Sequence, residues 1–304
     1  MAGTSRSGRW KLRRDRKAED ARWKHGLWPA RSVERFVVSF PKSGRTWLRV
    51  MMAVAEAGAR GEARERVVQE WLGSEAPRLN GAAVLFTHGL SVPADEPAAA
   101  MPLFLAYIGD RRRLFLVRDP RDTVVSYYFQ LTSRARRRTL PESTSLGSFL
   151  RHADWGIERI LRFNRACSGS LRDDPGPVML LAYEDLHRDA MGSLRSVLDF
   201  LEAAPVSDDV LRSAVEYGRF ENMQMLEHEA TFDEHNRRLV ARHPDDPESY
   251  KTRRGEVGGY RDYLCADEIA YLEERIAALQ PPELGYLEPG MPPSLSVREV
   301  SARA

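Results

Sequence analysis

The stretch SFPKSGRTWLRVMM, from Ser39 to Met52, constrains the fold of this 304-residue chain more than any other segment. A short apolar run, RFVVSF, leads into it, and a run with apolar residues at helical spacing follows. A turn between a strand and a helix can direct the unpaired N–H groups of the first helical turn at an anion. The candidate anion-binding residues are Lys42, Ser43, Gly44, Arg45 and Thr46. An ordinary strand-to-helix turn, in which the glycine only permits the bend, is the structural alternative.

The position of the lysine separates this loop from the loop of nucleoside triphosphatases. That loop reads G-x-x-x-x-G-K-[ST], with the lysine after the second glycine. Here Lys42 comes two positions before Gly44, the only glycine of the segment. A kinase or another nucleotide hydrolase would also need Mg²⁺ held by the residue after its lysine. The missing G-K-[ST] ending therefore disfavours a triphosphate, and a small-molecule kinase is kept as the alternative function.

Apolar runs and helical periodicity alternate along the chain. The expected strands are Arg35–Phe40, Ala83–Thr87, Arg113–Val117 and Val178–Tyr183. The expected helices are Thr46–Ala59, Pro120 to about Leu131, Leu146–Cys167, Ala190–Ala203, Asp208–Tyr217 and Asp267–Leu279. Apolar strands separated by helices predict a parallel sheet with helices on both faces. In such sheets a ligand lies beyond the carboxyl ends of the strands.

The ends of the chain differ in composition from its centre. Residues 1–32 form a basic arm that contains Trp10, Trp23 and Trp28. This arm is either solvated or in contact with an anionic ligand, partner or membrane surface. Residues 33–280 are expected to form one domain, and residues 281–304 a poorly packed extension rich in Pro and Gly. The polar region His228–Gly259 is expected to be a long surface loop.

Composition excludes several functional classes. The net charge of +2 gives little support to nucleic-acid binding, and no apolar run is long enough for a membrane span. The first thirty residues lack the apolar core of a secretory signal. Cys167 and Cys265 have no metal-site spacing and suit a reducing compartment. We therefore expect a cytoplasmic protein without a bound metal.

A second chemistry-bearing segment, RLFLVRDPRDTVVSYYFQ, runs from Arg113 to Gln130. Asp119 followed by Pro120 indicates an N-cap and the first helical residue, and Asp122 stands where a capping box has its acid. Arg118 then lies at the end of a strand, at the ligand-binding edge of the sheet. Its planar guanidinium can hold a phosphate, although a structural ion pair is equally compatible with the sequence.

Together, FPKSGRTW and LVRDPRDTVVSYY resemble the corresponding segments of sulfotransferases that use 3′-phosphoadenosine 5′-phosphosulfate (PAPS). AYEDL, at Ala182–Leu186, and RRGEVGGYRDYL, at Arg253–Leu264, are also similar to segments of this family. The four segments occur in the family's order and span Arg35 to about Leu279. The resemblance implies a three-layer, P-loop-like α/β fold with a central parallel sheet. It also implies PAPS as the sulfuryl donor and metal-independent transfer to a small-molecule hydroxyl acceptor.

The resemblance assigns a role to each matching position. The loop Lys42–Trp47 would hold the 5′-phosphosulfate, with Lys42 on the bridging oxygen and Trp47 near the adenine. Arg118 and Ser126 would bind the 3′-phosphate. The closing loop would add Arg253, Arg254 and Gly255, and Tyr183 would lie near the adenosine. Phe220 and Met223 match the family's adenine-contacting stretch less closely.

His88 is the candidate general base. It follows the strand AVLFT, and FTHGL resembles the segment that carries the catalytic histidine of cytosolic sulfotransferases. An imidazole with an ordinary pKa near 6.5 can accept a hydroxyl proton at neutral pH. Golgi relatives place a glutamate in the helix after the loop instead, but LRVMMAVA has no acid before Glu56. Lys42 and His88 are thus the expected catalytic pair for in-line sulfuryl transfer.

The chain also departs from the family's pattern. Arg45 stands where many relatives have threonine, and Tyr260 where the aromatic residue is often tryptophan. The dimer motif K-x-x-x-T-V-x-x-x-E is not recognisable around YRDYLCADE, so a homo-oligomer is left open.

The sequence leaves the acceptor and the lid open. The aromatic candidates for an acceptor cleft, or alternatively for the core, are Tyr127, Tyr128, Phe129, Trp155 and Phe232. The arginines equally permit an acidic or glycosylated acceptor, and a specialised metabolite is our expectation. SRARRR, at Ser133–Arg138, and the loop before Arg253 are candidate lids. The Ala- and Arg-rich composition is typical of a bacterial source.

Overall fold

The computed structural model describes residues 33–89, 97–134, 140–141, 143–173, 176–231, 239–241 and 245–298. The basic arm with its three tryptophans, Phe232 and most of the SRARRR segment lie outside the described residues.

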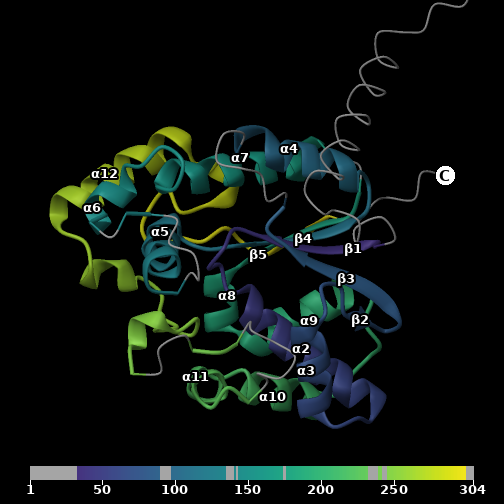
Figure 1. Ribbon diagram of the computed structural model, residues 1–304. Helices are drawn as coiled ribbons and strands as arrows, with labels where there is room; N and C mark the ends of the chain where they lie inside the picture. Colours follow the sequence, from purple (N-terminus) through teal and green to yellow (C-terminus); the bar gives the residue numbers. More distant parts are fainter. Residues whose placement is uncertain are drawn as a thin grey trace, which may run out of the picture.

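A six-stranded sheet in the order β2-β3-β1-β4-β5-β6 forms the middle layer (Figure 1). The strands are β1 (Arg35–Ser39), β2 (Arg78–Leu79), β3 (Ala82–Thr87), β4 (Arg112–Val117), β5 (Val178–Ala182) and β6 (Ser296–Arg298). β3, β1, β4 and β5 are parallel, so the expected parallel sheet is confirmed at its centre. The short edge strands β2 and β6 pair antiparallel, which makes the whole sheet mixed.

Helices cover both faces of this sheet. They are α2 (Arg45–Arg60), α3 (Arg64–Gly73), α4 (Pro97–Ile108), α5 (Pro120–Phe129), α6 (Leu146–Leu150), α7 (Ile157–Asp173), α8 (Tyr183–Arg188), α9 (Ala190–Phe200), α10 (Asp208–Tyr217), α11 (Phe220–His228) and α12 (Ala266–Leu279). The helices α3, α4, α8 and α11 were not among the expected ones. A π-helical turn, Gln130–Arg134, extends α5, and 3₁₀ turns lie at Pro247–Ser249, Gly259–Asp262 and Pro282–Leu284.

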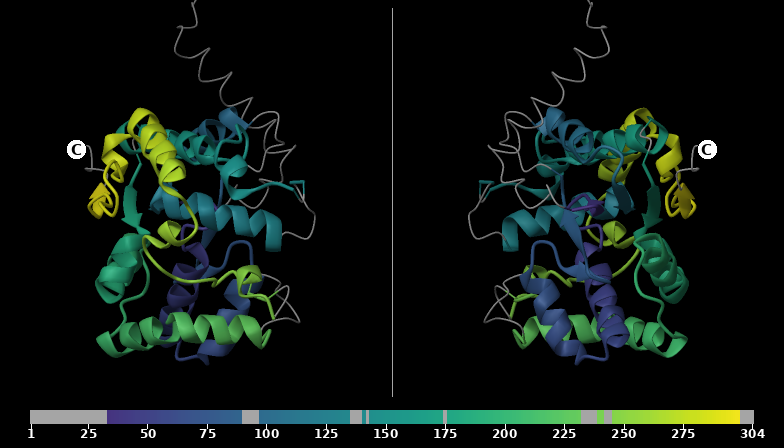
Figure 2. Two further views of the ribbon diagram at one scale, coloured as in Figure 1. Left: turned by 90° about the vertical axis from the view of Figure 1, so that its left-hand side faces the viewer. Right: turned by 90° about the vertical axis from the view of Figure 1, so that its right-hand side faces the viewer.

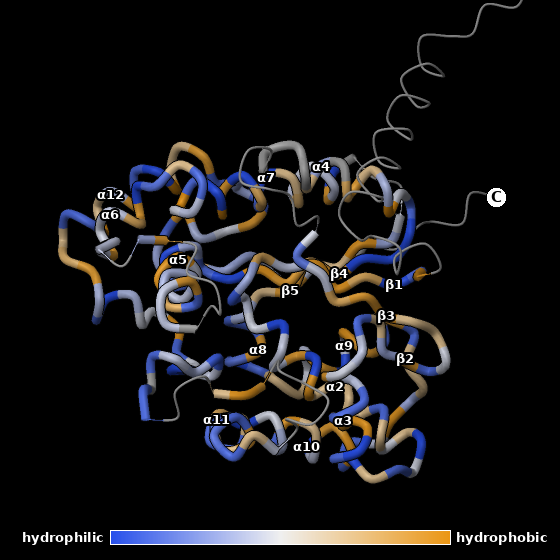
Figure 3. Tube along the Cα trace, viewed as in Figure 1, coloured by the Kyte–Doolittle hydropathy of each residue, from blue (hydrophilic) through white to orange (hydrophobic). Residues whose placement is uncertain are grey.

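Alternation along the strands divides the core into two layers. Val37 of β1 points to the side covered by α2, α3, α9 and α10, whereas Phe36 and Val38 point to the side of α4 and α7. Figure 3 shows the apolar residues concentrated along the central strands. A third apolar cluster joins α5 to α6, α7 and α12. The expected three-layer arrangement is therefore confirmed.

The single helix expected over Leu146–Cys167 is wrong. α6 ends at Leu150, α7 begins at Ile157, and residues between them form turns. A Cβ atom on Gly156 would lie 2.3 Å from the carbonyl oxygen of Leu150, so this tight turn requires glycine. Both helices bury apolar residues in the same cluster, which is why the periodicity continues across the break.

The segment after Pro281 is better packed than its composition suggests. Leu284 and Tyr286 are fully buried against the sheet, and β6 pairs with β5. Figure 2 shows this C-terminal segment along one edge of the sheet. Leu284 and Tyr286 therefore depart from the expected poor packing, whereas Leu287, Met291, Leu295 and Val297 are exposed.

The region His228–Gly259 is also more than a surface loop. Leu239, Ser249 and Tyr250 are buried, and Glu227 of α11 accepts hydrogen bonds from the N–H groups of Lys251 and Thr252 at 2.6 and 2.8 Å. This anchoring fixes the start of the segment that carries Arg253 and Arg254.

Candidate functional site

A cavity of about 580 Å³ lies at the carboxyl ends of the parallel strands. Its walls come from the segments after β1, β3, β4 and β5, from α11 and its preceding turn, and from residues 251–260. The sequence-predicted residues that line it are Lys42, Gly44, Arg45, Thr46, Trp47, His88, Arg118, Ser126, Tyr183, Phe220, Met223, Arg253, Arg254 and Gly255. Ser43 belongs to the same loop but is buried and does not line the cavity.

The loop after β1 has the backbone of an anion-binding turn. Lys42 and Gly44 both have left-handed φ angles, 73° and 89°. A Cβ atom on Gly44 would lie 2.5 Å from Cδ2 of Tyr183, so only glycine permits this close approach. α2 begins at Arg45 without a capping side chain or an acid in its first turn. Its free N–H groups and its dipole therefore favour an anion in the cavity.

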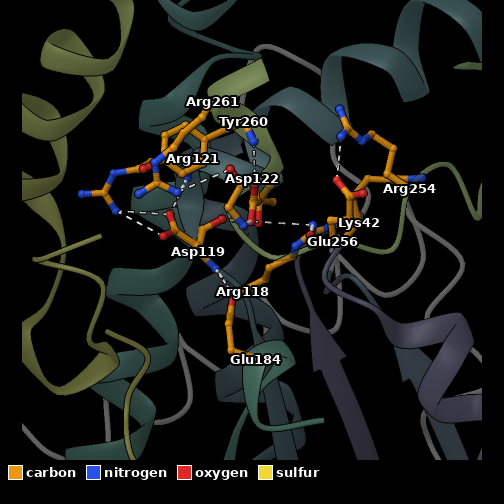
Figure 4. Close-up of polar contacts among 12 residues, drawn as sticks. Lys42, Arg118, Asp119, Arg121, Asp122, Glu184, Arg254, Glu256, Tyr260 and Arg261 are labelled. Carbon is orange, nitrogen blue, oxygen red and sulfur yellow. Dashed lines mark hydrogen bonds and ion pairs between the residues drawn. The ribbon is translucent and has the colours of Figure 1, made fainter. Parts of the chain in front are cut away.

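Arg118 links three separate parts of the chain. Its guanidinium donates to the carbonyl oxygens of Lys42, at 3.2 Å, and Glu256, at 2.9 Å. It also lies 4.3 Å above the ring of Tyr183 and 3.8 Å from the Asp122 carboxylate. The strand-end arginine is thereby held where the first loop, α8 and the C-terminal segment meet (Figure 4).

Asp122 has a different function from the expected capping one. Its carboxylate accepts hydrogen bonds from the N–H groups of Gly258, at 2.7 Å, and Tyr260, at 3.0 Å. Asp119 is the N-cap, as expected, and accepts from the N–H of Arg121. The N–H of Asp119, which a capping box would join to Asp122, donates instead to Glu184. Asp122 therefore attaches residues 258–260 to α5.

The hydrogen bonds of His88 define its tautomer. Nδ1 lies 2.8 Å from the carbonyl oxygen of Ser39, and Nε2 lies 2.8 Å from Nη2 of Arg45. Because a guanidinium only donates, Nε2 must accept and Nδ1 must carry the proton. Desolvation, together with the positive charges of Arg45 and Lys251, lowers the pKa of His88 well below its ordinary value. His88 lines the cavity, and its Nε2 is the unprotonated ring nitrogen.

Aromatic residues form the wall between the loop and α8. The ring of His187 lies 4.9 Å from Trp47 and 4.6 Å from Tyr183. Within the described residues, the buried Nε1 of Trp47 and Nε of Arg118 have no hydrogen-bond partner. Trp47 and Arg118 both line the cavity, and unsatisfied donors beside an aromatic surface suit a ligand with an aromatic base and an anionic group.

Arg253 and Arg254 line the cavity and are already paired with acidic or aromatic side chains. Arg253 lies 3.0 Å from the Glu248 carboxylate and 4.4 Å from the Phe129 ring. Arg254 forms ion pairs with Glu256 and Asp262 at 2.7 and 2.6 Å.

Sequence reasoning missed several cavity residues. These are chiefly Gln130, His187, Arg219, Lys251, Thr252 and Glu256. Of these, only Glu256 falls within a segment that supported the resemblance. Of the aromatic acceptor candidates, Tyr127 lines the cavity and also packs in the third cluster. Tyr128, Phe129 and Trp155 are partly buried against that cluster.

Two features are absent from the described residues. No helix there is long and apolar enough to span a membrane. No group of three or more His, Cys, Asp or Glu side chains there is arranged to hold a metal ion.

Sequence comparison places this chain among known domains. The family model described as Sulfotransferase domain matches residues 34–280. Cytosolic sulfotransferase 12 of Arabidopsis thaliana is 25% identical over 170 residues, which cover 51% of this chain and 47% of that protein. Sulfotransferase 2A6 of Mus musculus is 24% identical over 212 residues, which cover 66% of this chain and 70% of that protein. The chain thus spans about half the length of the plant relative.

Solved structures share the fold. Mouse sulfotransferase SULT7A1 complexed with PAP matches with a TM-score of 0.57 and 18% identity, covering 82% of this chain and 85% of the other. Retinol dehydratase in a complex with retinol and PAP matches with a TM-score of 0.55 and 19% identity, covering 82% and 81%. This similarity confirms the expected P-loop-like fold.

Proposed function

The chain belongs to the sulfotransferase domain family, and from this premise we propose that it transfers the sulfuryl group of PAPS to a hydroxyl group of a small-molecule acceptor. The observation that carries the proposal is the convergence of Lys42, Arg118 and His88 on one cavity at the carboxyl edge of the sheet. A small-molecule kinase is not favoured, because the family match and the missing G-K-[ST] ending both argue against it.

The cavity fits the donor in its chemistry. The loop Lys42–Trp47 offers left-handed backbone, uncapped N–H groups and the Lys42 ammonium to a 5′-phosphosulfate. When bound, PAPS supplies an activated sulfuryl group on a good leaving group. The buried Ser43 would contribute to this loop through its backbone.

The other donor contacts follow from the remaining walls. Arg118 and Ser126 would bind the 3′-phosphate, aided by Arg253, Arg254 and Gly255. Trp47, Tyr183, Phe220 and Met223 would enclose the adenosine. Since Arg253 and Arg254 are held by Glu248, Glu256 and Asp262, they would exchange part of these ion pairs for phosphate.

His88 is proposed as the general base. Its Nδ1–H bond to the carbonyl oxygen of Ser39 orients the ring and leaves Nε2 to accept the acceptor's hydroxyl proton. Lys42 and the N–H groups of the loop would stabilise negative charge that develops on the transferred and leaving oxygens. The proposed chemistry uses no metal ion.

Calorimetry with adenosine 3′,5′-bisphosphate (PAP), the expected product nucleotide, tests the donor site. We expect metal-independent binding that Arg118→Ala weakens strongly, and sulfation by the wild type that His88→Ala abolishes. Binding of ATP with Mg²⁺, and none of PAP, would replace this proposal with the kinase function.

We also propose that the enzyme is cytoplasmic and bacterial. Cys167 and Cys265 are both free, which supports a reducing compartment such as the cytoplasm. The relatives named above come from a plant and an animal, so the bacterial source is supported by composition alone. Residues 33–280 would form the catalytic domain, in agreement with the matched range. Cell fractionation and mass measurement in solution would test the location and a homo-oligomer.

A further inference from the structure

The side chain of Arg45 lies on the acceptor side of the cavity. As the first residue of α2, Arg45 offers its backbone N–H group to the donor loop, but its guanidinium extends to Nε2 of His88, 2.8 Å away. Nε2 is the atom that would take the acceptor's proton. Arg45 therefore occupies the position that the acceptor's hydroxyl group needs.

Within the described part of the chain, the charged side chains that act on His88 are positive. Arg45 and Lys251 both line the cavity and both act on His88 electrostatically. Among the described lining residues the acids are Asp122 and Glu256. Asp122 is bonded to Gly258 and Tyr260, and Glu256 is paired with Arg254, so both serve the donor side. An acceptor hydroxyl that reaches Nε2 therefore arrives beside two cations.

Displacement of Arg45 from Nε2 costs the guanidinium a hydrogen bond in a partly enclosed site. A neutral acceptor offers no equivalent replacement. A carboxylate on the acceptor does, because its two oxygens match the planar fork of arginine. We propose that the acceptor carries an anionic group, a carboxylate in the simplest case, next to its reactive hydroxyl, and that the Arg45 side chain recognises it. This proposal rests on the sulfotransferase function proposed above.

Two phenols of equal size test the proposal by binding. Protein saturated with PAP is titrated with 2-hydroxyphenylacetate, an anion whose carboxylate lies next to the hydroxyl group, and with 2-hydroxyphenylacetamide, its neutral counterpart. We expect the carboxylate to bind at least about tenfold more tightly than the amide. Arg45→Thr should bring this ratio close to one, and Arg45→Lys should restore part of it. Saturation with PAP makes the ratio independent of changes in donor affinity.

The matched control is Arg60→Thr, which removes the same charge from the other end of α2, about 22 Å away. It should leave the ratio unchanged. Equal binding of the two phenols, binding of neither, or an unchanged ratio in Arg45→Thr would overturn the proposal.

A carboxylate could also bind the PAP complex in the space that the sulfuryl group of PAPS would occupy. A second measurement tests for this. With PAPS as the donor, kcat/KM should also favour 2-hydroxyphenylacetate over the amide. A carboxylate that binds the PAP complex but is not sulfated would overturn the proposal. Failure of PAP itself to bind the wild type would instead refute the proposed function, so the two failures are distinguishable.

Discussion

Arg118 donates a hydrogen bond of 2.9 Å to the carbonyl oxygen of Glu256, a residue 138 positions further along the chain. The same guanidinium reaches the carbonyl oxygen of Lys42 at 3.2 Å. One arginine at the end of β4 therefore holds the loop after β1 and the C-terminal segment in a fixed relation (Figure 4). The 3′-phosphate of the donor would be bound at a point that already orders both walls.

Arg118→Lys should weaken PAP binding more than binding of adenosine 5′-phosphate, which has no 3′-phosphate. A lysine keeps the charge but not the planar fork, and a charge-assisted hydrogen bond contributes about 1.5–3 kcal/mol. We expect PAP to bind about 10- to 100-fold more weakly, with a change of less than about threefold for the monophosphate. Calorimetry of both ligands measures this, with the exposed Arg66→Lys as control. Equal losses for both ligands would show that Arg118 acts on the fold of the site only.

Asp122→Ala should loosen residues 258–260. The variant leaves the N–H groups of Gly258 and Tyr260 without the carboxylate that now accepts from both. Loss of hydrogen bonds to a charged group costs about 1.5–3 kcal/mol, so hydrogen exchange at these amides should rise about 10- to 100-fold. The exposed Asp199→Ala on α9 serves as control. Unchanged exchange at Gly258 and Tyr260 would contradict the anchoring role.

The sequence was sufficient to predict which residues lie at the strand ends. It was insufficient to predict the contacts between segments that are far apart along the chain. Lys42 and Arg118 follow apolar runs and precede helix signals, so local pattern alone places both at the carboxyl edge of the sheet. The partner of Asp122 lies 136 positions away, and local capping rules describe only the first helical turn. The pairing could be found only once the fold brought the two segments together.

Some parts of the C-terminal segment are ordered by tertiary packing, although their local sequence predicts irregular structure. Tyr286 follows a glycine and precedes a Pro-rich stretch, which suggests irregular structure. The gap it fills between Glu184 and the sheet arises from other parts of the chain. Likewise β6 is three residues long and exists through its pairing with β5. Strands this short have no sequence periodicity of their own.

The pH dependence of activity should follow the pKa of His88. Desolvation and the charges of Arg45 and Lys251 lower this pKa well below the ordinary 6.5, and the hydrogen bond to Ser39 opposes them. His88 is then neutral at pH 7, and kcat/KM should fall only at pH values below 6.5. The unfolded chain binds this proton more readily than the folded protein, so stability also decreases as the pH falls through this range.

Arg45→Thr should move this acidic limb to higher pH, because the substitution removes one of the charges that oppose protonation. An NMR titration of the His88 ring, assigned with His88→Gln, measures the pKa without reference to turnover. A wild-type pKa at or above 6.5, or no change in Arg45→Thr, would contradict this prediction.

Tyr286→Phe should destabilise the whole fold. The buried hydroxyl group donates to the Glu184 carboxylate, whose other oxygen accepts from the N–H of Asp119. A buried acceptor left unsatisfied costs about 1–3 kcal/mol of unfolding free energy, measurable in urea at pH 7. Leu287→Ala, at a neighbouring side chain that is 44% exposed, should change it by less than about 0.5 kcal/mol. Equal effects of the two substitutions would mean that the C-terminal segment contributes no specific contact.

Gly44→Ala and Gly61→Ala separate loop geometry from backbone strain. Both glycines have left-handed φ angles, 89° and 65°, so both substitutions should cost about 1–2 kcal/mol of strain. A Cβ atom on Gly44 would lie 2.5 Å from Cδ2 of Tyr183, whereas one on Gly61 would have nothing within 4 Å. The ring of Tyr183, which lies beneath the Arg118 guanidinium, must then shift. We expect Gly44→Ala to bind PAP at least about tenfold more weakly than Gly61→Ala in calorimetry well below the unfolding temperature. Similar PAP affinities for the two variants would show that the close approach of Gly44 to Tyr183 is not needed for the donor site.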